Sequence, residues 1–100
     1  MSPSPSLHLT SAAEQDLADA IDWYEEQHPG LGNEFLLSVD ATFSNIRRNP
    51  EQYPVMYRGL RRALVRRFPF SVFYLVESPQ ITVLAVFHVR RNPKEWKSRF

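Results

Sequence analysis

The 100-residue sequence contains no cysteine, so it can form neither a disulfide framework nor a zinc site with thiolate ligands. It also has no apolar run near the roughly 20 residues that a membrane-spanning helix needs. The start of the chain, rich in serine and proline, lacks the basic region and the apolar stretch of a signal peptide. We therefore expect a disordered tail at residues 1–6, a single domain over residues 7–100, and a location in the reducing cytoplasm.

Basic residues are missing from the first part of the chain, although the formal net charge of the whole is +1. Residues 1–46 contain eight acidic residues and no lysine or arginine, whereas residues 47–100 contain twelve basic and three acidic residues. This asymmetry can create a positive surface for an anionic partner. Alternatively, the two halves pack side by side and neutralise each other. Charge alone favours neither interpretation.

The three histidines do not predict a metal site. His8 and His28 are far apart in the sequence and have no metal-ligand spacing. His88 has an intrinsic pKa suited to proton transfer, but a lone histidine on a strand is more often a hydrogen-bonded structural residue. We expect neither a metal nor any other cofactor.

Two amphipathic helices are predicted in the acidic half. Ser11 and Glu14 have the Ser-x-x-Glu spacing of a capping box, and Pro29-Gly30 ends the helix that begins there. A second helix is predicted from about Leu31 to Arg48, where Asn49-Pro50 ends it. Because only a few residues link the helices, we expect an antiparallel hairpin.

The basic half is typical of β-structure after a loop at residues 50–59. Strands are predicted at residues 7–9, 60–68, 70–77 and 81–88. Pro93 is well placed to open a last short helix that carries Trp96. The order β-α-α-β-β-β predicts an α+β domain, in which an N-terminal strand and a helical hairpin pack on an antiparallel sheet.

The strand at residues 81–88 is apolar on both faces. Alternation would place Val83, Ala85 and Phe87 on one face, and Leu84 and Val86 on the other. Such a strand is expected in the middle of a sheet that is covered on both sides.

Three local patterns, in this order of elements, resemble the RelE/ParE toxin family. The first is Leu9-Thr-x-x-Ala-x-x-Asp16-Leu17, continuing to Trp23-Tyr24. The second is Arg67-Phe68-Pro69-Phe70-x-Val72-x-Tyr74. The third and most specific is Val86-Phe87-His88-x-Arg90-Arg91-x-Pro93-x-x-Trp96-x-x-Arg99. Together they span nearly the whole chain after the tail.

The resemblance implies the toxin of a type II toxin–antitoxin pair with a RelE/ParE-like fold. In this family a cognate antitoxin wraps the toxin with a helix and an extended segment. Operator DNA is bound only through the complex of the two proteins. The free toxin inhibits growth in one of two ways: RelE-like members enter the ribosome and cut messenger RNA, and ParE-like members block DNA gyrase.

The residues at the RelE-like catalytic positions favour the ParE-like activity. RelE-like enzymes use basic residues on the sheet and an acid/base residue near the C-terminus. Aligned through the hairpin, one of their arginines falls on Ser71 and another on Arg91, whereas their C-terminal tyrosine region falls near Trp96 and Lys97. The nuclease set is therefore incomplete, which favours inhibition of gyrase.

Two alternatives remain open at this point. A RelE-like, metal-independent endoribonuclease would use Arg66 and Arg91 to neutralise phosphate charge and His88 as the general base. A degenerate family member could instead be retained only as a non-toxic binding module.

The predicted partner-binding residues are arginines and tryptophans. Four arginines in the strand at residues 60–68 suit antitoxin carboxylates or nucleic-acid phosphates; a solvated edge or salt bridges to the acidic helix are the alternatives. Trp23 lies off the apolar stripe of the first predicted helix. Trp96 could anchor a partner, but such a tryptophan more often pins its own short helix to the sheet. The full set is Trp23, Arg61, Arg62, Arg66, Arg67, Arg90, Arg91 and Trp96.

Overall fold

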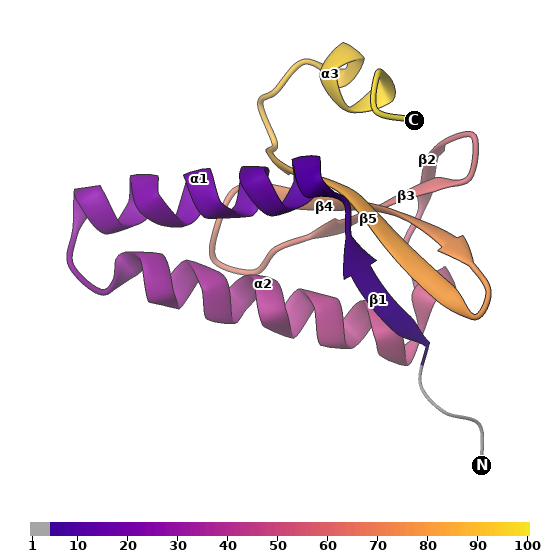
Figure 1. Ribbon diagram of the computed structural model, residues 1–100, viewed down its shortest axis with the longest axis horizontal. Helices are drawn as coiled ribbons and strands as arrows, with labels where there is room; N and C mark the ends of the chain where they lie inside the picture. The colour runs from indigo at the N-terminus through magenta and orange to yellow at the C-terminus, as the bar shows by residue number, and fades with distance from the viewer. Residues whose placement is uncertain (1–4) are drawn as a thin grey trace.

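The computed structural model describes residues 5–100, so most of the predicted tail at residues 1–6 lies outside the described part. A five-stranded sheet carries a two-helix hairpin on one face (Figure 1). The elements are β1 (Ser6–Leu9), α1 (Ser11–Gln27), α2 (Leu31–Arg48), the 3-10 turn η1 (Pro50–Gln52), β2 (Val55–Tyr57), β3 (Leu60–Leu64), β4 (Phe70–Glu77), β5 (Gln80–His88) and α3 (Pro93–Lys97). The predicted α+β class is confirmed, with β2 as an additional strand. Within the described residues, no helix combines the length and the apolar character needed to cross a membrane.

The sheet has the strand order β1-β5-β4-β3-β2. Strands β2 to β5 are antiparallel neighbours, as expected, whereas β1 joins the edge of the sheet parallel to β5. The N–H of Thr10 donates to the carbonyl of Val83 at 3.0 Å and extends this pairing to the start of α1. The last long strand is therefore central, as its two apolar faces predict.

The helical hairpin begins one residue earlier than the predicted capping box. The hydroxyl of Thr10, not Ser11, accepts the N–H of Ala13 at 3.1 Å. The turn between the helices contains Gly30 with a φ of 91°, in the region that favours glycine. A Cβ on Gly32 would lie 2.7 Å from the carbonyl oxygen of Ile21, so glycine there lets α2 approach α1 closely.

The larger core lies between the hairpin and the sheet. Phe35, Val39 and Ile46 of α2 are fully buried against the sheet, and each such side chain contributes roughly 1.5–3 kcal/mol through its burial. Tyr74 of β4 is also buried there, and its hydroxyl donates to the carbonyl of Pro50 at 2.6 Å. This bond fastens the end of the hairpin to the sheet.

A smaller core covers the opposite face under α3. Its buried members are Leu60, Phe73, Ala85, Phe87 and Trp96. The Trp96 ring stacks on Phe73 with the centroids 4.7 Å apart and an interplanar angle of 19°. Trp96 therefore pins α3 to the sheet, and Asn92 caps that short helix by accepting the N–H of Lys94 at 2.9 Å.

A β-bulge changes the predicted alternation of β5. Tyr74 pairs with Val83 and Phe73 pairs with Ala85, so Leu84 has no partner on β4. After the bulge Val86 faces the hairpin, whereas Leu84 packs beside Ala85 and Phe87 on the α3 side. The predicted assignment of faces was therefore wrong for both sets: Val83 shares the hairpin face with Val86, and Leu84 shares the α3 face with Ala85 and Phe87.

The predicted strand at residues 60–68 was too long. Strand β3 ends at Leu64, and residues 65–69 form the bend that leads into β4. Arg67 takes a φ of 72° in this bend, and the N–H of Val65 donates to the carbonyl of Phe70 at 2.9 Å. The segment has no glycine or asparagine to signal a turn, which is why its alternation was interpreted as a strand.

Candidate functional site

A surface groove with a volume of about 530 Å³ lies between α2 and the end of β3. One wall is a stripe along α2, and the other consists of residues from the segment that follows η1 and from the end of β3. The lining residues are Glu34, Leu37, Ser38, Ala41, Thr42, Asn45, Tyr53, Leu64, Arg66 and Arg67. We call it the α2 groove.

Two exposed leucines give the α2 groove apolar walls. Leu37 is 60% exposed and Leu64 is 58% exposed, which is unusual for large apolar side chains that line one depression. Arg66 and Arg67 stand at its rim in the bend after β3, and both are exposed. Among residues 5–100 neither guanidinium has a hydrogen bond or an ion pair, so both are available to an anionic partner.

The other two arginines of the predicted basic strand lie on β3 and differ from each other. Arg61 donates to the carbonyl oxygens of Glu51 at 3.0 Å and of Tyr53 at 2.5 Å. It therefore has a structural role in fixing the loop after α2. Arg62 faces the opposite side of the sheet, next to Phe73, and its guanidinium has no hydrogen bond within the described part of the chain.

The end of β5 brings together His88 and Arg91. The Nδ1 atom of His88 accepts the N–H of Arg90 at 3.1 Å, so this nitrogen is occupied. Arg91 donates from Nε to Glu95 at 2.8 Å and places its guanidinium 3.8 Å from the centroid of Phe87. The hydrogen bond with Glu95 raises the pKa of Arg91, and the same bond lowers the pKa of Glu95. Arg90 is exposed at the surface.

Only two of the three predicted catalytic residues lie together. His88 and Arg91 line the same two cavities, of about 220 and 130 Å³. Arg66 lines the α2 groove, and within residues 5–100 no described cavity contains Arg66 together with His88. Ser71, where a RelE-like arginine is expected, is buried.

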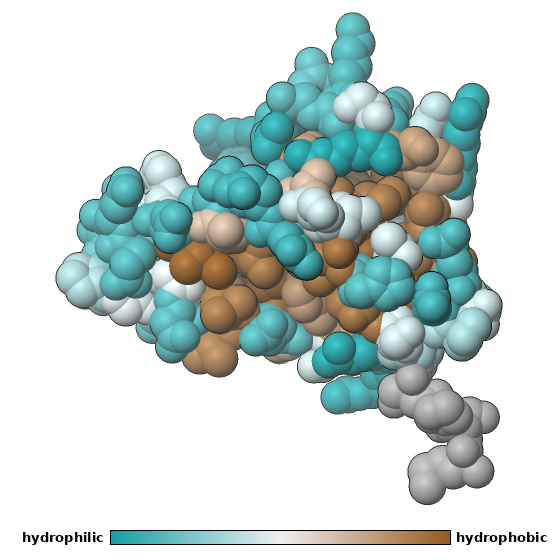
Figure 2. All heavy atoms as spheres, viewed as in Figure 1, coloured by the Kyte–Doolittle hydropathy of each residue, from teal (hydrophilic) through white to brown (hydrophobic). Residues whose placement is uncertain are grey.

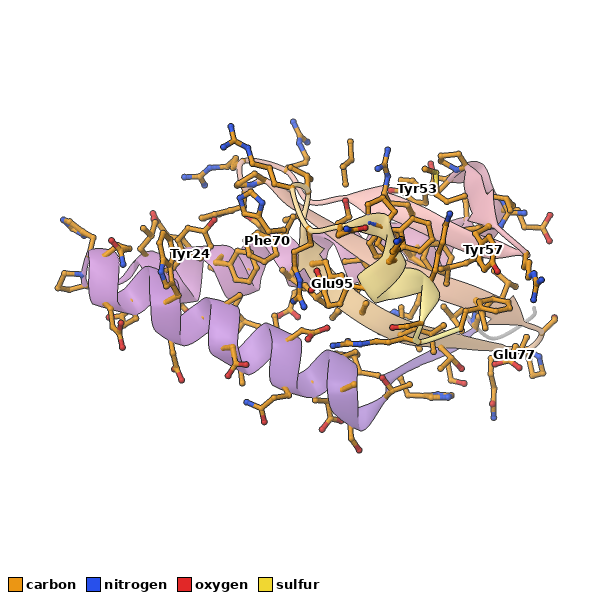
Figure 3. The ribbon with its side chains drawn as sticks, turned by 90° about the horizontal axis from the view of Figure 1, so that it is seen from above. Tyr24, Tyr53, Tyr57, Phe70, Glu77 and Glu95 are labelled. Atoms are coloured by element: carbon orange, nitrogen blue, oxygen red, sulfur yellow. The ribbon has the colours of Figure 1, made fainter. Side chains whose placement is uncertain are left out.

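The two tryptophans occupy opposite environments. Trp23 on α1 is 56% exposed and lies beside an apolar cavity of about 350 Å³. Tyr24 and Phe70, which contribute to this cavity, lie next to each other from α1 and β4 (Figure 3), with ring centroids 6.0 Å apart. Trp96 is 8% exposed and offers little surface to a partner. Trp96 is buried because its ring stacks on Phe73 in the smaller core.

Apolar surface also reaches the solvent along the hairpin. Figure 2 shows brown side chains between rows of polar ones where α1 and α2 lie side by side. The acidic side chains of α1 are exposed around it, apart from Asp16, so they form a solvated face.

Asp16 and Arg99 form an ion pair that sequence analysis missed. The two guanidinium nitrogens of Arg99 lie 2.5 and 3.0 Å from the carboxylate oxygens of Asp16. Asp16 also accepts the N–H of Val86 at 3.1 Å, and Arg99 donates to the carbonyl of Leu84 at 3.2 Å. Only the spacing of Asp16 and Arg99 in the first and third family patterns could have indicated these two residues.

Within the described residues, no group of three or more histidine, cysteine, aspartate or glutamate side chains is arranged to hold a metal ion. The arrangement instead offers arginines, exposed apolar side chains and one groove. These are features of surfaces that bind macromolecules.

Comparison with known proteins identifies the family. The model of the family described as the ParE toxin of type II toxin–antitoxin systems matches residues 7–93. Toxin ParE2 of Mycobacterium tuberculosis is 28% identical over 88 residues, which cover 87% of this chain and 84% of that protein.

Two solved structures share the fold. The chromosomal ParDE toxin–antitoxin system from P. aeruginosa superposes with a TM-score of 0.75 at 22% identity, covering 85% of this chain and 96% of the matched one. The RelBE2 toxin–antitoxin complex from Mycobacterium tuberculosis superposes with a TM-score of 0.61 at 18% identity, covering 86% and 99%.

Proposed function

Because the chain belongs to the ParE toxin family of type II toxin–antitoxin systems, we propose that it inhibits DNA gyrase and is neutralised by a cognate antitoxin that docks in the α2 groove. The two solved relatives are described as a ParDE toxin–antitoxin system and as a RelBE2 toxin–antitoxin complex. An antitoxin partner for this chain is the corresponding expectation. The α2 groove and the arginines at its rim support the binding location that we propose for it.

The shape of the α2 groove suits an amphipathic helix of the antitoxin. Its wall on α2 extends from Glu34 to Asn45, a length of about 16 Å at 1.5 Å per residue. Ser38, Ala41 and Thr42 are short side chains in this wall, so the backbone of a second helix could approach closely. Apolar side chains of that helix would cover the exposed leucines of both walls, as in other helix-in-groove complexes.

The charge at the rim of the groove sets the expected chemistry of the antitoxin helix. Arg66 and Arg67 would pair with its carboxylates, preferably in bidentate geometry. We therefore expect an acidic flank on the side of the helix that faces the bend after β3.

Our proposal that gyrase is the target rests on the separation of Arg66 from His88 and Arg91, which line different cavities. Metal-independent RNA cleavage needs phosphate-binding cations and an acid/base pair around one scissile bond. Tyr74 is not a free acid, because its hydroxyl donates to Pro50 and burial raises its pKa to about 12. The exposed Trp23 beside an apolar cavity instead suits a protein target.

Parallel assays of supercoiling and translation test this proposal. Purified toxin should stop ATP-dependent supercoiling by gyrase, and messenger RNA should stay intact in cells that express the toxin. Added antitoxin should restore supercoiling. Codon-positioned cuts in messenger RNA with normal supercoiling would instead establish the RelE-like endonuclease, for which His88 and Arg91 in shared cavities are the supporting observation. Normal growth with both processes intact would identify a non-toxic binding module.

A further inference from the structure

A small cavity on the α3 side of the sheet has polar groups that the proposed function has not used. It has a volume of about 130 Å³ and lies where β3, β4 and the segment leading into α3 meet. Arg62, Ser71, His88 and Arg91 supply its polar lining, and Met56, Phe73 and Trp96 supply apolar walls. We call it the Ser71 pocket.

The hydroxyl of Ser71 is an unpaired group within this pocket. Ser71 is 1% exposed, and its Oγ atom is the buried side-chain polar atom among residues 5–100 that has no hydrogen-bond partner. Buried hydroxyls are normally paired, because leaving one unpaired costs free energy. An acceptor atom inside the pocket would satisfy it.

Two guanidinium groups flank this hydroxyl. Arg62 lies opposite Phe73 in the register of β3 and β4, so it points to the same face as Ser71. Its guanidinium is half-buried and has no partner in the described part of the chain. Arg91 uses only Nε for Glu95, so its other N–H groups can still donate. Two cations and a hydroxyl donor define a site for an oxyanion.

The dimensions and the charge of the surroundings favour a carboxylate. About 130 Å³ equals the share of roughly four water molecules at ~30 Å³ each, enough for a carboxyl group and its neighbouring methylenes but not for a nucleotide. A planar carboxylate matches the fork of a guanidinium. Glu95 stands beside Arg91 and would repel a polyanion more than a single carboxylate.

The Ser71 pocket also lies within reach of a chain in the α2 groove. Leu64, which lines the groove, pairs in register with Ser71 across β3 and β4. Helix α2 lines the α2 groove and Trp96 of α3 lines the Ser71 pocket, so the two depressions lie on opposite faces of the sheet near the end where Leu64 pairs with Ser71. The segment at β2 bonds to β3 as far as Arg62, whose N–H donates to the carbonyl of Pro54 at 3.2 Å; within the described residues no strand pairs with this edge of β3 at Leu64.

We propose that the Ser71 pocket binds the carboxylate of an aspartate or glutamate side chain of the antitoxin, from a segment that continues past the α2 groove around the end of β3. This inference rests on the proposed pairing with an antitoxin. The carboxylate accepts from the Ser71 hydroxyl and from the guanidinium groups of Arg62 and Arg91, and the apolar walls strengthen these bonds by excluding water.

Titration of the free protein with sodium acetate tests the pocket itself. In amide-resolved NMR spectra, acetate at constant ionic strength should shift the amide of Ser71 and the Nε–H of Arg62. The affinity should fall about tenfold in Arg62→Gln and severalfold in Ser71→Ala, whose unchanged spectra elsewhere would show that the fold is intact. Arg48→Gln, a change at an exposed arginine at the end of α2, is the matched control and should bind like the wild type. Equal acetate affinity in Arg62→Gln and Arg48→Gln would overturn the inference.

The complex with the antitoxin tests the source of the carboxylate. In that complex acetate should no longer shift the Ser71 amide, because the pocket is filled. If the antitoxin binds but acetate still shifts this amide, the inference about the Ser71 pocket fails, whereas the proposed binding of an antitoxin is supported. If the antitoxin does not bind at all, the proposed function fails, whereas the acetate titration still decides the anion site. Displacement of acetate by a short single-stranded RNA, but not by the antitoxin, would overturn the inference in favour of a nucleic acid.

Discussion

Arg99, the second-to-last residue of the sequence, binds the carboxylate of Asp16 on α1 through two guanidinium nitrogens. This pair stands where β1 has ended and α1 has begun, so the outer edge of β5 no longer has a strand beside it. Asp16 accepts the N–H of Val86, and Arg99 donates to the carbonyl of Leu84. The ion pair therefore replaces the missing strand along the bulged part of β5 and joins the first helix to the C-terminal segment.

We expect Asp16→Ala to destabilise the fold by roughly 2–3 kcal/mol, because it leaves the N–H of Val86 and the half-buried guanidinium of Arg99 without their acceptor. Asp16 has only 9% of its side chain exposed, so water replaces the lost bonds poorly. Urea unfolding monitored by circular dichroism measures the difference. Asp19→Ala, an exposed change one turn further along α1, is the control and should cost much less. Equal losses in the two variants would show that the ion pair adds nothing.

Substitution of Trp96 should affect mainly stability, and substitution of Trp23 should affect mainly function. Trp96→Ala removes a ring that stacks on Phe73 in the smaller core, so we expect a loss of about 3–5 kcal/mol in the free energy of unfolding. Trp23→Ala removes an exposed ring, so we expect nearly unchanged stability and reduced inhibition of gyrase. Thermal unfolding and a supercoiling assay on both variants measure this. Full inhibition by Trp23→Ala would exclude this tryptophan from the target interface.

Much of the fold could be predicted because its signals are local. The bounds of α2 and β4 were predicted correctly because Asn49-Pro50 follows the helix and Ser78-Pro79 follows the strand. The bend at residues 65–69 was missed because Arg67 occupies a conformation that usually signals itself through glycine. The bulge at Leu84 was missed because both faces of β5 are apolar, so a shift in alternation leaves no trace in the sequence.

Less of the candidate site could be predicted, because it depends on contacts between distant segments. The sequence identified the arginines but gave no sign that Arg61 is bonded to two loop carbonyls while Arg66 stays free. Asp16 was one of several acidic residues on α1, and its role depends on the edge that β1 leaves open. The unpaired hydroxyl of Ser71 is a property of packing alone.

Tyr74 should make the fold sensitive to alkaline pH. Burial raises its pKa from 10.0 to about 12, although Arg61 acts in the opposite direction. Because the folded protein holds this proton more tightly than the unfolded chain, the contribution is complete below about pH 10 and is lost as the pH rises towards 12. A shift of about two units corresponds to roughly 2–3 kcal/mol.

Tyr74→Phe tests this linkage. The variant should be less stable at neutral pH by about 1 kcal/mol, because the carbonyl of Pro50 loses its donor. Its stability should nevertheless fall less steeply than that of the wild type between pH 10 and 12. Urea midpoints across this range measure both effects. A decline as steep as in the wild type would mean that other groups cause the alkaline loss.

The rim of the α2 groove provides the most direct test of antitoxin binding. The double variant Arg66→Gln, Arg67→Gln should keep its fold, because both side chains are exposed and unbonded in the described structure. Its affinity for the antitoxin should fall by roughly 10- to 100-fold, the range expected when close charged pairs are lost at an interface. The double variant Arg47→Gln, Arg48→Gln at the end of α2 changes the net charge equally and lies outside the groove. Isothermal titration calorimetry at two salt concentrations then distinguishes specific ion pairs at the rim of the groove from a general electrostatic attraction between the two proteins. If both doubles weaken binding equally, only the net charge matters and the antitoxin helix does not lie in this groove.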